Sequence, residues 1–200
     1  MAFTFFFRDR HTLEQLTSFL LPQIDSYAKI KIWDAGCAMG PEPYTFGIIL
    51  CEAIGPEKYK KVSILATDID ETSNFKEIIT RGVYPYSDLS RMPPNILEKY
   101  FHKIDDYDNY QINDIIRNSL YFEQHDLLSL KPLDTGLNAI ICKNVLLHFQ
   151  PEERVNVIKM FHSVLRNDGL LITEQTQTLP EECSHLFEKV CSDANIFRKK

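Results

Sequence analysis

The hydrophobic positions of the chain fall into two patterns, short apolar runs and longer stretches in which apolar residues recur every three or four positions. Leu13, Leu16 and Leu20 have the second spacing and predict a helix over residues 10–21, which Pro22 would end. Further helices are predicted over residues 44–53, 71–80, 152–165 and 181–190, and strands over residues 30–33, 62–67, 120–122, 138–142, 170–173 and 195–198. Strands and helices that alternate in this way indicate an α/β fold with a mainly parallel sheet and helices on both faces.

Residues 83–117 interrupt this alternation. They contain the prolines of Tyr84-Pro85 and Met92-Pro93-Pro94, a short helical stretch over residues 96–101 and a polar, aromatic stretch over residues 104–110. A chain of 200 residues suits one domain with a sizeable core. We therefore expect residues 1–200 to form a single domain, with a small inserted subdomain over residues 83–117.

Composition limits the kinds of partner. A net charge of −6 argues against a nucleic-acid backbone as the main partner, because proteins that bind one usually carry a basic footprint. The five cysteines include no C-x-x-C pair, which is typical of reduced thiols in a cytoplasmic protein and gives no metal-ligand spacing. The apolar run over residues 2–7 is too short to cross a membrane, and no signal peptide is visible. The sequence thus predicts a cytoplasmic protein without membrane insertion or a bound metal.

Small residues recur at every second position directly after the first predicted strand, at Gly36, Ala38 and Gly40. A backbone without bulky side chains can turn tightly there and let a ligand lie against it, and the helix that follows offers free N–H groups. A dinucleotide fingerprint would place a third glycine where Pro41 stands. The next strand is followed by Asp68, whose carboxylate could accept hydrogen bonds from ribose hydroxyls. This pattern looks like the S-adenosylmethionine (SAM) site of Rossmann-like methyltransferases.

Polar residues follow the other predicted strands as well. In open α/β sheets, ligands bind outside the carboxyl ends of the strands. Loop residues are polar in general, so each of these side chains taken alone is more readily explained as a solvated loop residue, and Asp68 is the strongest candidate for a ligand contact. The strand-end residues are Asp34, Asp68, Asp126, Lys143, Asn144 and Glu174.

Motifs along the whole chain resemble those of the CheR-type chemotaxis-receptor methyltransferases, which use SAM to methylate glutamate side chains. Residues 4–9 resemble the family's opening T-x-F-F-R-[DE], and residues 33–45 resemble its W-x-A-G-C-S-x-G-E-E-P-Y-S. Further similar segments lie at residues 66–70, 82–84, 141–149 and 167–174. The resemblance implies a Rossmann-like class I methyltransferase fold, with SAM as the cofactor.

The resemblance also implies roles for individual residues. Arg8 would approach the cofactor and the methyl-transfer centre, and Asn144 would line the site beside the sulfonium. The region 83–117 would correspond to the small β subdomain that grips a receptor peptide in some members. Asp68 would contact the ribose, and Asp126 and Leu127 would lie beside the adenine. Ala35, Gly36 and Glu42 would surround the methionine moiety, and Glu42 could pair with its ammonium group. Gly40 would form part of the cradle.

The chain departs from the family pattern mainly on the side of the methyl acceptor. Lys143 replaces the family's arginine, which keeps the charge but loses the planar fork. His148 replaces a tyrosine, Pro41 replaces the first glutamate of the G-E-E-P motif, and Asp126 replaces an asparagine. The family's helical N-terminal domain, which contributes to receptor recognition, would precede residue 4, and we expect it to be absent here.

These features leave three functions open. A glutamate acceptor is already an anion near neutral pH, so a cation such as Arg8 would suffice to steer it. A hydroxyl acceptor must lose a proton, and His148 could accept it in a small-molecule O-methyltransferase, although a lone histidine more often packs at a helix start. The third function is a non-catalytic module that binds SAM or S-adenosylhomocysteine (SAH). The partner is accordingly a protein carboxylate, as in a receptor or signalling protein, or a small-molecule acceptor.

Overall fold

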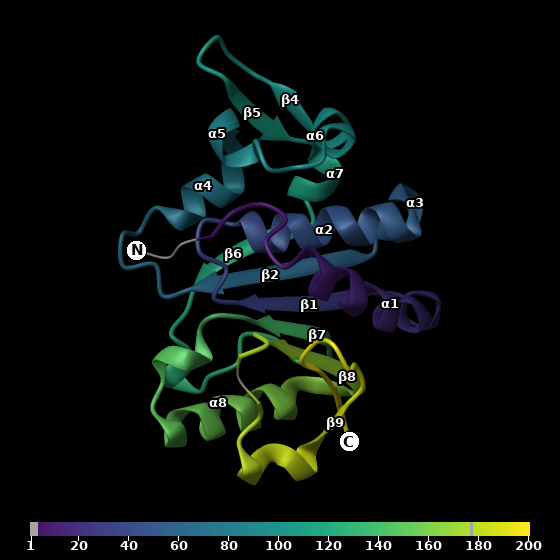
Figure 1. The fold of residues 1–200 in the computed structure, drawn as a ribbon, viewed down its shortest axis with the longest axis vertical. Helices are drawn as coiled ribbons and strands as arrows, with labels where there is room; N and C mark the ends of the chain where they lie inside the picture. Colours follow the sequence, from purple (N-terminus) through teal and green to yellow (C-terminus); the bar gives the residue numbers. More distant parts are fainter. Residues whose placement is uncertain (1–3, 177) are drawn as a thin grey trace.

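The computed structural model describes residues 4–176 and 178–200 and contains a seven-stranded sheet (Figure 1). The strands follow the order β6-β2-β1-β7-β8-β10-β9, in which β10 is antiparallel to both of its neighbours and the other pairs are parallel. The expected mainly parallel sheet is thereby confirmed. The strands are β1 (Ile30–Ala35), β2 (Val62–Asp68), β6 (Leu120–Gln124), β7 (Leu137–Cys142), β8 (Leu165–Thr173), β9 (Phe187–Lys189) and β10 (Ile196–Lys199).

Side chains that alternate along β1 divide the core into two halves. Ile30 and Ile32 join one buried cluster, whereas Trp33 and Ala35 join a second. The first cluster includes residues of α1 and α2, and the second includes residues of α8, so helices cover both faces of the sheet, as expected (Figure 1). The helices around the sheet are α1 (Arg10–Ser26), α2 (Pro41–Ile54), α3 (Pro56–Tyr59), α4 (Phe75–Arg81), α7 (Asp114–Arg117) and α8 (Pro151–Val164).

Between α4 and α7 the chain leaves the main sheet and forms a three-stranded antiparallel sheet at one end of the molecule (Figure 1). This small sheet lies within the segment 83–117, where the sequence interrupts its alternation. That the segment acts as a separate subdomain stays a prediction. The elements of the segment are β3 (Val83–Pro85), α5 (Tyr86–Leu89), α6 (Pro94–Tyr100), β4 (Phe101–Lys103) and β5 (Asn109–Ile112), in the sheet order β3-β5-β4.

Residues 4–9, here called the N-terminal segment, connect the small sheet with the main one. Phe6 is fully buried, and its ring meets the rings of Tyr84 and Phe101 edge to face, with centroids 4.9 and 5.6 Å away. The backbone N–H of Phe7 donates to Thr45 Oγ1 of α2 at 3.0 Å. The N-terminal segment therefore packs against strands of the small sheet and against a helix of the main sheet.

Four predictions of secondary structure are wrong. The helix predicted over residues 71–80 is α4, which begins only at Phe75, because the Asp70 carboxylate accepts hydrogen bonds from the backbone N–H groups of Asn74 and Phe75. α1 continues through Pro22 to Ser26, because the extra turn buries Ile24 and lets Gln23 Nε2 donate to the Asp168 carbonyl at 2.7 Å. Packing thus outweighs the helical hydrogen bond that a proline cannot make. Residues 181–190 form a 3-10 helix, η3 (Glu181–Leu186), followed by β9, which pairs with the edge that β10 would otherwise leave open. The strand predicted over residues 170–173 is β8, which already begins at Leu165 and contains a register shift in its pairing with β7.

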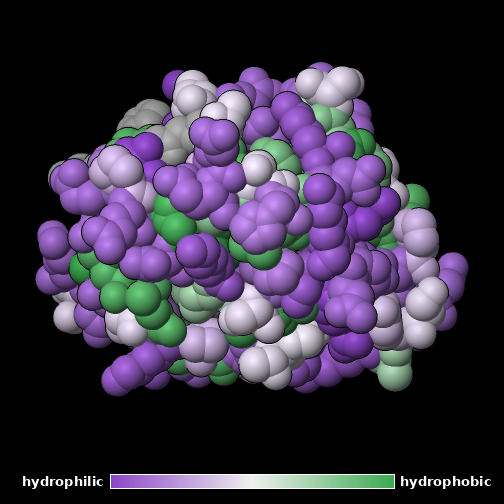
Figure 2. All heavy atoms as spheres, turned by 90° about the horizontal axis from the view of Figure 1, so that it is seen from below, coloured by the Kyte–Doolittle hydropathy of each residue, from purple (hydrophilic) through white to green (hydrophobic). Residues whose placement is uncertain are grey.

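The surface around α8 and η3 is mainly hydrophilic, with apolar side chains in small separate patches (Figure 2). None of the described helices is long and apolar enough to cross a membrane. Residues 2 and 3 of the early apolar run lie outside the described residues. All five cysteines are free and buried, as expected for reduced thiols.

Replacing Phe6 with alanine should lower the free energy of unfolding by about 3–5 kcal/mol, because the lost ring leaves a cavity between the two sheets. Urea unfolding followed by circular dichroism measures the change. Tyr107→Ala is the control, because Tyr107 is 87% exposed and its loss should change stability by less than about 0.5 kcal/mol. Equal losses in the two variants would show that Phe6 does not join the sheets.

Candidate active site

The strand order places a ligand site at the carboxyl ends of β1 and β7. From β1 the chain continues to β2 on one side, while β7 lies on the other side, so the direction of winding reverses between β1 and β7. In open α/β sheets, ligands bind at such a switch point. A cavity of about 780 Å³ opens there, lined by residues that follow β1, β2, β6 and β7.

Most of the residues that the sequence singles out line this cavity. Ala35 and Gly40 do not, because Ala35 is buried in the core and Gly40 is the residue before α2. The structure therefore brings the predicted residues together at one place, and their contacts with a cofactor stay a prediction. The predicted residues that line the cavity are Arg8, Gly36, Glu42, Asp68, Asp126, Leu127, Asn144 and His148.

The loop between β1 and α2 needs glycine at two positions. Gly36 has φ 107° and Gly40 has φ 100°, values that side-chain-bearing residues rarely adopt. A Cβ at Gly36 would collide with the side chain of Val145, and a Cβ at Gly40 would lie 2.8 Å from Tyr84 Oη. The loop expected from the sequence to form a cradle thus has no room for a side chain at Gly36 or Gly40.

Asp68 holds this loop in place at the end of β2. Its Oδ2 accepts a hydrogen bond from the backbone N–H of Ala38 at 2.9 Å, and its Oδ1 accepts one from Asp70 at 3.2 Å. A carboxylate has about four lone-pair sites, so acceptor capacity remains on the side that faces the cavity. Asp126 is anchored in a similar way, because its carboxylate accepts from the backbone N–H of Leu128 at 2.9 Å.

A buried lysine forms two ion pairs on one wall of the cavity. Lys143 Nζ lies 2.9 Å from Glu42 Oε2 and 3.0 Å from Asp9 Oδ2, and the exposed fractions of the three side chains are 1%, 13% and 48%. Burial alone would lower the pKa of Lys143, but the carboxylates of Glu42 and Asp9 outweigh this effect and hold it above its ordinary value. The sequence identifies Lys143 as a strand-end residue and as a departure from the family, but it does not predict the ion pair with Asp9, since nothing in the local sequence links the two.

Asp34 lies fully buried at the end of β1, close to this ion-pair cluster. Neither of its carboxylate oxygens has a hydrogen-bond partner among residues 4–176 and 178–200. Burial raises the pKa of Asp34 well above its usual range, and the negative charge of Glu42 raises it further. Burial without a hydrogen-bond partner therefore disfavours the ionised form of this carboxyl group.

Arg8 and Asn144 come together from distant parts of the chain. Arg8 Nη2 donates to Asn144 Oδ1 at 3.4 Å, and the backbone N–H of Asn144 donates to Glu174 Oε2 at 3.1 Å. Asn144 has φ 59°, and Phe7 and Asp9 have φ 61° and 50°. Such left-handed backbone is costly for residues with side chains and tends to cluster at functional sites.

His148 ends a short 3-10 helix, η2 (Leu146–His148), and its side chain is exposed at the cavity, beside Leu147 and Phe149. An exposed side chain at the cavity is what a base that faces the acceptor requires, and that role of His148 stays a prediction. Among the described residues, no group of three or more His, Cys, Asp or Glu side chains could hold a metal ion.

Comparison with known families identifies the family to which the chain belongs. Residues 2–196 match the family described as "CheR methyltransferase, SAM binding domain". The chain belongs to this family. The expected resemblance to the CheR-type methyltransferases is therefore confirmed, and SAM is the cofactor of the domain.

Relatives of this CheR-family chain include two chemotaxis protein methyltransferases. The protein from Borreliella burgdorferi is 32% identical over 184 residues, which cover 88% of this chain and 64% of the relative. The protein from Listeria monocytogenes is 31% identical over 168 residues, covering 83% and 61%. The chain thus spans less than two thirds of the length of these relatives. A solved TehB-like SAM-dependent methyltransferase from Corynebacterium glutamicum shares 14% identity at a TM-score of 0.47, covering 92% of this chain and 85% of that one.

The residues of the CheR-family site fit SAM. Gly36 lines the cavity without a side chain, so the loop backbone there can lie against a ligand, and Asp68 offers carboxylate lone pairs at the position expected for a ribose. The cavity-lining carboxylate of Glu42 makes this end of the cavity favourable for a cation. The ammonium group of a bound methionine moiety would share Glu42 with Lys143.

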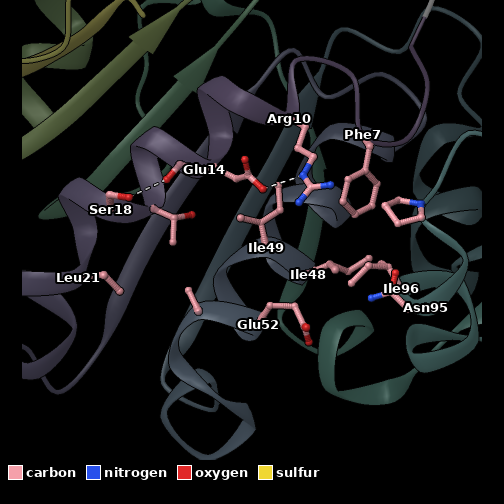
Figure 3. Close-up of a pocket in the computed structure, with 13 residues that line it drawn as sticks. Phe7, Arg10, Glu14, Ser18, Leu21, Ile48, Ile49, Glu52, Asn95 and Ile96 are labelled. Atoms are coloured by element: carbon pink, nitrogen blue, oxygen red, sulfur yellow. Dashed lines mark hydrogen bonds and ion pairs between the residues drawn. The ribbon is translucent and has the colours of Figure 1, made fainter. Parts of the chain in front are cut away.

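A second pocket, of about 470 Å³, lies between α1, α2 and α6 (Figure 3). Several of its polar side chains are bonded to one another or to neighbours. Arg10 Nε lies 2.7 Å from Glu14 Oε1, and Ser18 Oγ donates to the Glu14 carbonyl at 3.1 Å. Phe7 lines this pocket, whereas Arg8 lines the cavity of about 780 Å³ described above, which we call the SAM cavity. The N-terminal segment therefore lies between the two.

Replacing Lys143 with methionine should lower the free energy of unfolding by about 3 kcal/mol, because it leaves the carboxylates of Glu42 and Asp9 without their cation. The value lies at the lower end for buried ion pairs because Asp9 is half exposed. Thermal and urea unfolding measure the change.

The matched control for this variant is Lys58→Met. Lys58 pairs with Asp25 at 2.7 Å on the open surface, so the loss of its charge should change stability little. If both lysine variants unfold at the same urea concentration, the buried ion pairs do not stabilise the site.

Proposed function

We propose that this chain is a SAM-dependent methyltransferase that transfers a methyl group to a carboxylate oxygen of a protein glutamate. The observation that carries the proposal is the position of Arg8, which lines the SAM cavity and donates to Asn144. A cation at this place can attract and orient an anionic acceptor. The two relatives above are named chemotaxis protein methyltransferases, which supports a protein substrate such as a receptor or signalling protein.

Methyl transfer to a glutamate carboxylate depends more on aligning the carboxylate with the methyl group than on acid–base catalysis. SAM, when bound, supplies a methyl group on a positively charged sulfur. A glutamate side chain, with an ordinary pKa of about 4.3, is an anion near neutral pH and can attack without losing a proton. The protein then has to orient the carboxylate in line with the methyl group and exclude water. We assign the orienting role to Arg8 and Asn144.

The remaining site residues would hold the cofactor. We propose that Asp68 accepts hydrogen bonds from the ribose and that Glu42 faces the methionine ammonium. Residues 83–117 would act as an inserted subdomain that contacts the acceptor protein, and we infer that the protein works in the cytoplasm. The other proposed contacts are Ala35, Gly36 and Gly40 around the methionine moiety, and Asp126 and Leu127 around the adenine.

A second candidate function is O-methylation of a small-molecule hydroxyl group. The observation that favours it is the exposed His148 side chain at the cavity, where the family has a tyrosine. A hydroxyl must lose its proton as it attacks, and an imidazole can accept it. The third candidate, a module that only binds SAM or SAH, makes no use of His148 or Arg8.

Replacing Asp68 with alanine should weaken SAM binding on the order of 10- to 100-fold, because it removes the charged acceptor proposed for the ribose hydroxyls. Isothermal titration calorimetry with SAM and SAH measures the affinity. Asp88→Ala is the control, since Asp88 is an exposed carboxylate on α5 outside the cavity. Unchanged affinity in Asp68→Ala would place the ribose elsewhere, and no binding to the wild-type protein would contradict the proposed function.

Arg8 and His148 distinguish the acceptors. With a glutamate acceptor, Arg8→Ala should lower methyl transfer on the order of 100-fold, because the carboxylate loses its orienting cation, and His148→Ala should have little effect. The measurement is the transfer of labelled methyl from SAM to proteins of a source-cell extract, followed by release of the label as methanol in base.

The opposite pattern identifies the second candidate. A hydroxyl acceptor makes turnover depend on His148 and gives a methyl ether that base does not cleave. Conversion of SAM to SAH above the spontaneous rate excludes the binding-only module.

A further inference from the structure

Asp34 is a buried acidic residue that the proposed function leaves unused. It lies in β1, two residues before Gly36, and its side chain is fully buried. Neither carboxylate oxygen has a hydrogen-bond partner among residues 4–176 and 178–200. A carboxylate without hydrogen bonds in a buried place is strongly disfavoured in its ionised form.

The charged groups around Asp34 make ionisation harder still. Glu42 at the start of α2 and Asp68 at the end of β2 are both negative, and their fields raise the pKa of Asp34 beyond the effect of burial. Lys143, which follows β7, lowers it, but its ammonium group is already shared by Glu42 and Asp9. The ammonium group of Lys143 is thus the cation shared by the carboxyl groups of Glu42, Asp9 and Asp34, and Asp68 adds a further negative charge nearby.

The thiols near Asp34 add no charge. Cys37 and Cys142 both interact electrostatically with Asp34, and burial raises the pKa of each thiol well above its ordinary value. Both thiols are therefore neutral near neutral pH. The charge balance of the cluster depends on whether Asp34 holds a proton.

We propose that Asp34 is the charge-compensating residue of the cofactor site, protonated in the free protein and ionised when a cationic cofactor occupies the cavity. This inference rests on the proposed function. The balance is simple: the Asp34 carboxyl group breaks its O–H bond, the electron pair stays on the carboxylate, and the proton goes to solvent. The charge that favours this step is the sulfonium and ammonium charge that SAM brings into the cavity.

The proposal separates SAM from SAH by charge. Methyl transfer removes the positive charge from the sulfur, so SAH brings one positive charge less into the same cavity. The Asp34 carboxylate then loses part of its compensation and takes its proton back more readily. The site accordingly favours the methyl donor over the spent product, which assists product exchange.

Titration calorimetry in two buffers of different ionisation enthalpy tests this linkage. For wild-type protein at mildly acidic pH, the binding heat of SAM should depend on the buffer and correspond to release of up to about one proton per SAM bound. SAM affinity should rise by up to about tenfold per pH unit, and SAH should release fewer protons. In Asp34→Asn the heat should be independent of the buffer.

Glu71→Gln is the matched control. Glu71 is an exposed carboxylate that lines the same cavity, so its replacement removes one negative charge without touching the buried cluster. This variant should release as many protons as the wild-type protein. SAM binding without proton release, or proton release that survives in Asp34→Asn, would overturn the inference alone. Absence of SAM binding to the wild-type protein would overturn the proposed function and the inference with it.

The pH dependence of unfolding gives a second test that needs no cofactor. A carboxyl group that stays protonated in the folded protein and ionises in the unfolded chain makes stability fall as pH rises above its unfolded pKa of about 4. Asp34→Asn should therefore have a higher Tm than the wild-type protein at neutral pH, and the difference should shrink as the pH falls towards about 4. Parallel Tm curves for the two proteins would overturn the inference.

Discussion

The ammonium group of Lys143 lies between the carboxylates of Asp9 and Glu42, and these two ion pairs fix three parts of the chain at one point. A lysine with 1% of its side chain exposed has lost its hydration, so its partners must stay within reach. Asp9 comes from the N-terminal segment, Glu42 from the start of α2, and Lys143 follows β7. This wall of the cavity is thus held together by the two ion pairs of Lys143 as well as by the strands of the main sheet.

The opposite wall is assembled by β2. The carbonyl of Thr67 accepts from the backbone N–H groups of Gly36 at 2.8 Å and Cys37 at 3.0 Å, and the Thr67 hydroxyl accepts from Trp33 Nε1 at 2.9 Å. Asp68 adds the bond from Ala38. These contacts offset the cost of left-handed backbone at Ala38 and hold the loop against the end of β2.

The sequence predicts those features of the site that follow from backbone geometry. Gly36 and Asp68 could be found because a tight turn after a strand needs small residues, and because parallel strands end at a common edge. The partnership of Asp9 with Lys143 could not be found, since it depends on how the N-terminal segment folds back over α2. The burial of Asp34 is hidden for a similar reason, because a polar residue at a strand end is usually solvated.

Errors in the fold have the same origin. Residues 181–190 have helical spacing, and the gain from completing the sheet edge beside β10 decides against a regular helix at their end. Pro22 is a reliable stop in an isolated helix, but here the next turn contributes Gln23 to a bond with residue 168 of another element. In both cases the deciding partner lies far along the chain, where local periodicity carries no information.

The N-terminal segment shows how closely the two sheets are coupled at the site. Phe6 is buried against the small sheet, Arg8 lines the SAM cavity, and Asp9 pairs with Lys143. The left-handed backbone at Phe7 and Asp9 turns these neighbouring side chains in different directions. Because only one residue separates Phe6 from Arg8, the place of the guanidinium group over the cavity is set by the small sheet as much as by the main one. A protein that docks on the small sheet therefore contacts the structure that positions the proposed methyl-transfer residue.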